Sequence, residues 1–108
     1  MTPEAQLYHN IGSQINGAQA SQMFGKPCYK TNGKAFIAFF RECLVCKLSG
    51  ALHTRALALD GAVLFDPSGK NRPMKEWVQI PYTHQADWLP YAQAAFENVT
   101  SLSRNTLQ

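Results

Sequence analysis

The sequence predicts a two-layer α+β domain: a five-stranded, antiparallel-type sheet with helices on one face, in the order α-β-β-β-α-β-β-α. Two apolar runs, 35–40 and 43–48, are rich in aromatic and β-branched residues and flank the pair Arg41-Glu42, which predicts a β-hairpin. Residues 88–102 keep apolar side chains at helical spacing. Of the 108 residues, 45% are hydrophobic and 16% charged, as in an ordinary globular domain.

A helix is predicted at the start of the chain, over residues 3–16. Thr2 is placed to cap it, and Pro3 suits the first helical position. Its buried stripe consists of residues four apart: Leu7, Ile11 and Ile15. Gly12 lowers helix propensity by about 1 kcal/mol relative to alanine, so packing must hold this helix in place.

Three consecutive strands are expected next. The first covers residues 22–30, where Gly25 and Pro27 predict an edge position or a bulge. Asn32-Gly33 is the strongest short hairpin signal, because both residues accept a positive φ. Alternation along the strand 35–40 then places apolar residues on both of its faces: Ala35, Ile37 and Phe39 on one, and Phe36, Ala38 and Phe40 on the other.

A strand that is apolar on both faces needs cover on both. The helices of so short a chain cover only one face of the sheet, so aromatic side chains are expected to be exposed on the other. Monomers rarely expose a large apolar patch. We therefore expect a homodimer through the helix-free face, with Phe36 or Phe40 in its interface.

The second half of the chain begins with a short helix over residues 51–59, capped by Ser49. Strands at 62–66 and 76–80 flank a loop of turn residues. Because Pro90 would clash with the carbonyl of Ala86 inside a helix, the last helix is expected to start at an Asp87 cap and to cover 88–102. The domain then covers 1–102, and the polar residues 103–108 form a frayed tail.

The one motif with metal or redox spacing is Cys43-Leu-Val-Cys46. Residues three apart on a strand point to opposite faces, so these thiols are predicted to be small buried hydrophobes. Ser68-Gly69-Lys70 lacks the earlier glycine of a phosphate-binding loop. No metal site, cofactor or catalytic group is therefore predicted, and the chain is expected not to be an enzyme.

A basic segment offers the clearest binding surface. It contains Lys70, Arg72 and Lys75 close to Trp77, and the first hairpin adds three lysines: Lys26, Lys30 and Lys34. One interpretation is an anion- or RNA-contacting surface, with cations on phosphates and the tryptophan stacking on a base. The other is a solvated loop, a tryptophan packed on the sheet, and lysines that protect an edge strand.

The composition and net charge limit the class of protein. The net charge of +3 is smaller than is typical of a nucleic-acid-binding domain. No apolar run approaches the length of a membrane span, and the first residues do not form a signal peptide. Three cysteines cannot all pair within one chain, which fits a reducing compartment. A cytoplasmic location is predicted.

Three stretches resemble the N-terminal domain of the TfoX/Sxy family: 23–27 (Met-Phe-Gly-Lys-Pro), 32–36 (Asn-Gly-Lys-Ala-Phe) and the long run 64–81. Many members have Gly-Gly where this chain has Gly25-Lys26, so a role of a second glycine does not carry over. The resemblance covers about residues 20–100 and implies a two-layer α+β fold similar to secretion chaperones. Positions that match the family motif are Phe24, Gly25, Gly33, Phe36, Lys47, Asp66, Met74, Trp77 and Pro81.

The family is named for a regulator of natural competence, a role of longer members that carry a second, C-terminal domain. The resemblance therefore implies a bacterial regulatory module without specifying its molecular activity. Our leading hypothesis is a non-enzymatic interaction module that binds a protein partner. The alternative is a weak RNA- or DNA-binding module that uses the basic hairpin and the 70–75 loop.

Overall fold

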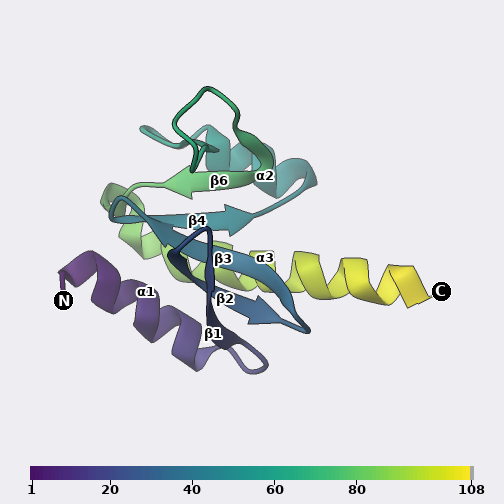
Figure 1. Cartoon of the computed structure of the whole chain (residues 1–108). Helices are drawn as coiled ribbons and strands as arrows, with labels where there is room; N and C mark the ends of the chain where they lie inside the picture. The colour runs from purple at the N-terminus through teal and green to yellow at the C-terminus, as the bar shows by residue number, and fades with distance from the viewer. Residues whose placement is uncertain (108) are drawn as a thin grey trace.

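One antiparallel sheet of six strands forms the first layer of the fold, and three α-helices pack on one of its faces (Figure 1). The computed structural model describes the backbone of residues 1–107 and the side chains of residues 1–101. Its elements are α1 (Pro3–Gln14), β1 (Gln19–Met23), β2 (Lys26–Thr31), β3 (Lys34–Phe40), β4 (Cys43–Lys47), α2 (Gly50–Leu57), β5 (Val63–Phe65), β6 (Met74–Ile80), the 3₁₀ helix η1 (Tyr82–His84) and α3 (Gln85–Leu107).

The predicted α+β class and the helices on one face are confirmed, but the sheet has six strands and not five. Residues 22–30 do not form one strand, because Phe24 and Gly25 both adopt positive φ and reverse the chain between β1 and β2. The strand order is β1-β2-β3-β4-β6-β5, so β1 and β5 are the two edges. The predicted turns at Asn32-Gly33 and Arg41-Glu42 are present.

A β-bulge in β3 changes which side chains face the helices. Tyr29 pairs with Ile37 and Lys30 with Ala35, so Phe36 has no partner of its own. As a result Phe36 and Ile37, although adjacent, both join the core beneath the helices. The predicted alternation is wrong at both Ala35 and Phe36: Ala35 packs on the face of Ala38 and Phe40, and Phe36 on that of Ile37 and Phe39. Simple period-two reasoning does not allow for an extra residue.

The main core lies between the sheet and the helices. Trp88 of α3 is its largest fully buried side chain and donates from its indole nitrogen to the carbonyl of Pro81 (3.2 Å). Asn98 of the same helix donates to the carbonyl of Lys47 and accepts a hydrogen bond from Ser49, so it joins α3 to the end of β4 and the start of α2. The predicted cap Ser49 thus points to α3 and makes no side-chain cap of α2.

A second, smaller core covers the helix-free face from within the chain. It contains Cys28, Ala38, Phe40, Val45, Phe65 and Trp77, with Met23, Ala35 and Met74 packed against them. Phe65 of the edge strand β5 packs against Phe40 of β3 at 5.2 Å between ring centres, although β4 and β6 lie between these strands, so the sheet curves toward this face. The premise that this face leaves large aromatic side chains exposed is therefore wrong.

The final helix starts earlier and ends later than predicted. It begins at Gln85, after η1, with Pro90 inside it, and runs to Leu107. Asp87 lies in its first turn and is not its cap. Pro90 removes one hydrogen bond near the start of the helix, and the burial of Trp88 and Ala92 outweighs that loss. The side chains of the expected polar tail, 103–108, lie outside the described residues.

Candidate functional site

Two cationic side chains and an aromatic ring meet where two hairpin turns come together at one end of the sheet. The ammonium nitrogen of Lys26 lies 5.4 Å from the centre of the Phe40 ring, and the guanidinium carbon of Arg41 lies 5.1 Å from it. Both distances are within the range of cation–π attraction. We call Phe24, Lys26, Phe40 and Arg41 the aromatic–cation corner, because Phe24 belongs to the turn directly before Lys26.

The backbone of Phe24 adopts a conformation that is unfavourable for phenylalanine. Its φ is +53°, in the left-handed region that costs a residue with a side chain about 1–2 kcal/mol. Its side chain is also 62% exposed, so little burial offsets that cost. Arg41 and Glu42, which form the neighbouring turn, have φ of +51° and +62°. Unfavourable backbone conformations therefore gather at this corner.

The two-residue turn between β2 and β3 has the residue types that its backbone conformation favours. Asn32 and Gly33 join β2 to β3, at the opposite end of that hairpin from Lys26. Asn-Gly is the preferred pair where both φ values are positive. The corner departs from this preference at Phe24, Arg41 and Glu42, and backbone strain of this kind is concentrated at functional sites in proteins.

Asp66 organises the basic loop between β5 and β6. Its carboxylate accepts hydrogen bonds from the Ser68 hydroxyl (2.6 Å) and from the backbone N–H groups of Ser68, Gly69 and Arg72. The Ser68 hydroxyl, followed by the three backbone donors, lowers the pKa of Asp66 below its ordinary value of 3.8. The hydrogen bonds to Asp66 therefore fix the conformation of the loop, and Lys70 and Arg72 are exposed on it.

The predicted basic residues do not form a single group around a tryptophan. Trp77 is 5% exposed and packs in the second core near Phe65, so it has no free face on which a base could stack. Lys26 and Lys34 lie at opposite ends of the β2–β3 hairpin. Lys26 and Lys30 are half-buried, whereas Lys34 and Lys75 are exposed. The predicted basic residues are therefore spread over separate parts of the surface and do not form one stacking site.

The predicted dimer contacts, Phe36 and Phe40, are both buried. Phe36 is fully buried on the helix side of the sheet, where its ring packs edge-on against Phe96 at 5.3 Å. Phe40 does lie on the helix-free face but is 9% exposed, because Phe65, Lys26 and Arg41 surround its ring. Phe36 is therefore excluded as a contact residue in the folded chain.

The cysteines have the arrangement predicted for a strand. Cys46 is in the main core, whereas Cys43 lies on the other face of β4 and faces Gln79. Burial raises the pKa of all three thiols, Cys28, Cys43 and Cys46, which disfavours the reactive thiolate form. Within the described residues no group of three or more potential ligands is placed to hold a metal ion.

The histidines that the chain offers as possible bases make structural contacts. His53 of α2 donates to the carbonyl of Lys75 at 2.7 Å, next to the basic loop. His84 donates to the carbonyl of Asp60 at 2.7 Å and so fixes the end of the segment that follows α2. In both residues the nitrogen that makes the contact is occupied by a backbone carbonyl.

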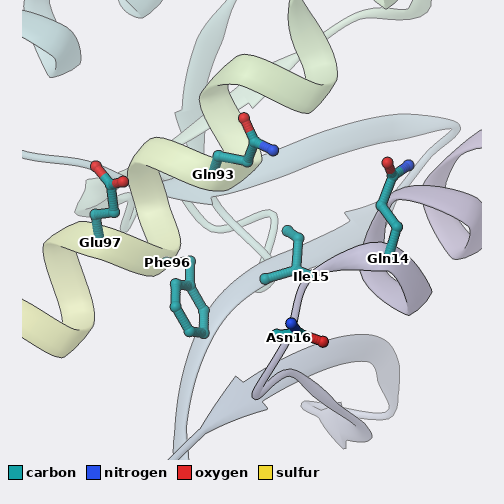
Figure 2. Close-up of a pocket in the computed structure, with 6 residues that line it drawn as sticks. All are labelled: Gln14, Ile15, Asn16, Gln93, Phe96 and Glu97. Carbon is teal, nitrogen blue, oxygen red and sulfur yellow. The ribbon is translucent and has the colours of Figure 1, made fainter.

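A hollow of about 400 Å³ lies between the end of α1 and the middle of α3 (Figure 2). Gln93 and Glu97 project from successive turns of α3, and Ile15 and Phe96 supply its apolar part. Gln14 and Asn16 complete the described lining. Amides and one carboxylate can bind a polar molecule, but this lining holds no nucleophilic side chain.

Sequence reasoning had found Lys26 and Phe40 but not the aromatic–cation corner. Phe24 was visible only as part of a family motif, and Arg41 only as a turn residue. A usable signal existed in the Phe-Gly pair at 24–25, because a glycine that follows an aromatic residue between two strands is compatible with a two-residue turn. The proximity of the two turns follows from the pairing of β2 with β3, which no local pattern specifies.

Within residues 1–107, no helix is both long enough and apolar enough to cross a membrane. No family model, curated protein or solved structure gives a significant match to the chain. The likeness to TfoX/Sxy domains thus stays an expectation, carried by the motifs quoted above.

Proposed function

We propose that this domain is a non-enzymatic, cytoplasmic interaction module that binds an acidic segment of a partner protein at the aromatic–cation corner. The observation that carries the proposal is Phe24, a large aromatic side chain held 62% exposed by a left-handed backbone. Phe24 precedes Lys26 by two residues in the chain, and aromatic residues and arginine are the types enriched at protein–protein interfaces. The three free thiols fit a reducing compartment.

The chemistry of the corner selects the partner. Lys26 and Arg41 are cations, whereas the nearest carboxylate along the chain, Glu42, accepts a hydrogen bond from the Thr2 hydroxyl at 2.6 Å. That contact ties Glu42 to the start of α1. A partner segment with one apolar residue for Phe24 and flanking carboxylates for Lys26 and Arg41 would complement the corner.

A second candidate function rests on the distribution of charge. Eight of the ten basic residues lie in 19–47 and 63–80, with only three of the seven acidic ones, so the sheet and its loops are strongly positive. Such a surface attracts polyanions, and weak RNA or DNA binding would use Lys34, Lys70, Arg72 and Lys75. The burial of Trp77 weighs against it, because it removes the expected stacking platform.

The two candidates are separated by peptide selection and by salt titration. We expect display of random 12-residue peptides against the folded domain to enrich sequences that combine Asp or Glu with an apolar residue. Phe24→Ala and Arg41→Ala should each weaken an enriched peptide about tenfold or more, as removal of an interface hot spot does. Leu52→Ala, which changes an exposed apolar side chain on α2, is the matched control.

Enrichment of basic or uncharged peptides, or peptide binding that survives Phe24→Ala, contradicts the proposal. Binding of a labelled oligouridylate that falls steeply with salt supports the nucleic-acid candidate. In that case replacement of Lys70, Arg72 and Lys75 by alanine should weaken binding, whereas Phe24→Ala should not.

A further inference from the structure

The two edges of the sheet are protected very differently. β5 has three residues, an irregular register between Leu64 and Phe65, and Pro67 soon after it. Short strands, irregularities and prolines are devices that prevent an edge from pairing with another chain. β1 has five residues in regular register with β2 and contains neither proline nor a charged residue. The edge at β1 therefore lacks these protections.

The geometry of the β1–β2 hairpin shows which backbone groups of β1 are free. Met23 and Lys26 close the two-residue turn, so they exchange backbone hydrogen bonds, and Ser21 and Gln19 continue that alternation. The N–H and C=O groups of Ala20 and Gln22 then point away from β2. Within the described residues neither of them has another backbone or side-chain partner, and residues 19–22 are exposed.

We infer that β1 pairs antiparallel with β1 of a second copy, about a two-fold axis at Ser21, which joins two sheets into one of twelve strands. In this register Ala20 lies opposite Gln22 of the other copy, and Gln22 opposite Ala20. Both residues are free on the outer edge, so the pairing satisfies all four outward groups of each copy reciprocally. The interface differs from the one predicted at Phe36 and Phe40.

The absence of charge on β1 favours a second copy of the chain, and not the acidic segment proposed for the corner, as the occupant of this edge. β1 reads Gln-Ala-Ser-Gln-Met and has no charge, so two copies meet there without repulsion although each carries a net charge of +3. An acidic segment would find no cation on β1 to complement. Self-pairing also needs no further chain, since an antiparallel two-fold arrangement presents the same strand from both sides.

The register is tested by charge placement, with sedimentation of the full chain over micromolar to submillimolar concentrations. We expect the wild type to dimerise. Ala20→Lys with Gln22→Lys should weaken the dimer about tenfold, because like charges then face each other twice across the axis. Ala20→Lys with Gln22→Glu places opposite charges across the axis and should restore the dimer. Circular dichroism checks that both double variants fold.

A cross-link gives an independent measurement. In the inferred register Ser21 faces Ser21 of the second copy as a non-hydrogen-bonded pair. The Cα atoms of such a pair lie about 4.5 Å apart, within reach of a disulfide. In a Cys43→Ser background, Ser21→Cys should form a disulfide-linked dimer under mild oxidation much faster than Ser13→Cys, an exposed control on α1. A monomeric wild type, a dimer indifferent to the paired lysines, or equal cross-linking of both cysteine variants would overturn the inference.

Discussion

The ring of Tyr29 fills the space that a side chain on Gly12 would need. A Cβ atom built on Gly12 would lie 2.1 Å from Cε2 of Tyr29. The helix α1 therefore approaches β2 closely only because residue 12 is glycine. The Tyr29 hydroxyl also reaches the carbonyl of His9 in the same helix, at 3.5 Å.

Gly12→Ala should destabilise the protein although alanine is the better helix former. The gain in propensity is about 1 kcal/mol, whereas overpacking of a filled core costs about 1–3 kcal/mol. We expect a net loss of about 1 kcal/mol in the free energy of unfolding, measured by urea denaturation. Gly12→Ala combined with Tyr29→Leu should recover part of it, and Ser13→Ala on the exposed side of α1 should cause no loss.

Phe24→Asn should make the protein more stable. Asparagine tolerates a positive φ much better than phenylalanine, so the substitution should relieve about 1 kcal/mol of backbone strain and removes little buried surface. Thermal and urea unfolding measure the gain. The same variant should bind the peptides selected for the corner more weakly. A loss of stability beyond about 1 kcal/mol would mean that Phe24 is a packing residue.

Phe36→Ala should cost about 3–5 kcal/mol, as deletion of a fully buried phenylalanine does. Its ring lies in the main core against Phe96 and has no role at the surface. Phe36→Asp should fail to fold, whereas a residue of a dimer interface would give a folded monomer. Urea titration of the alanine variant and circular dichroism of the aspartate variant decide between these outcomes.

The loop 66–73 should lose its order in acid. The pKa of Asp66 is lowered in the folded state, so its contribution is fully present above the ordinary value of 3.8 and is lost as the pH falls through the lower folded value. In NMR spectra the amide signals of Ser68, Gly69 and Arg72 should shift together, with a midpoint below that ordinary value. Asp66→Ala should abolish this titration, and Asp60→Ala should leave it unchanged.

The thiols of Cys28 and Cys46 should be unreactive in the folded protein. Burial raises the pKa of both, so almost no thiolate is present at neutral pH. A thiol reagent should label at most the half-buried Cys43 until denaturant is added. Cys43→Ser with Cys46→Ser should change only stability, and stoichiometric zinc in the purified wild type would contradict this interpretation.

Local chemistry in the sequence determined most of the elements. Thr2 and Pro3 start α1. Asn32-Gly33 and the apolar runs on either side of Arg41-Glu42 define two hairpins. Residues 76–80 alternate as predicted, with Val78 in one core and Trp77 in the other. Each of these signals depends on neighbours in the chain, through capping, turn conformation or side-chain period. Such preferences can be read without knowing what lies across the sheet.

Tertiary structure decided the rest. The bulge that turns Phe36 toward the helices depends on how β2 pairs with β3. The cover of the helix-free face depends on a sheet curved enough to bring the rings of Phe40 and Phe65 together. The aromatic–cation corner likewise exists because Lys26 and Arg41, fifteen positions apart, flank one Phe40 ring. Pairing register and sheet curvature are set by the combined packing of all the strands, so no single stretch of sequence specifies them.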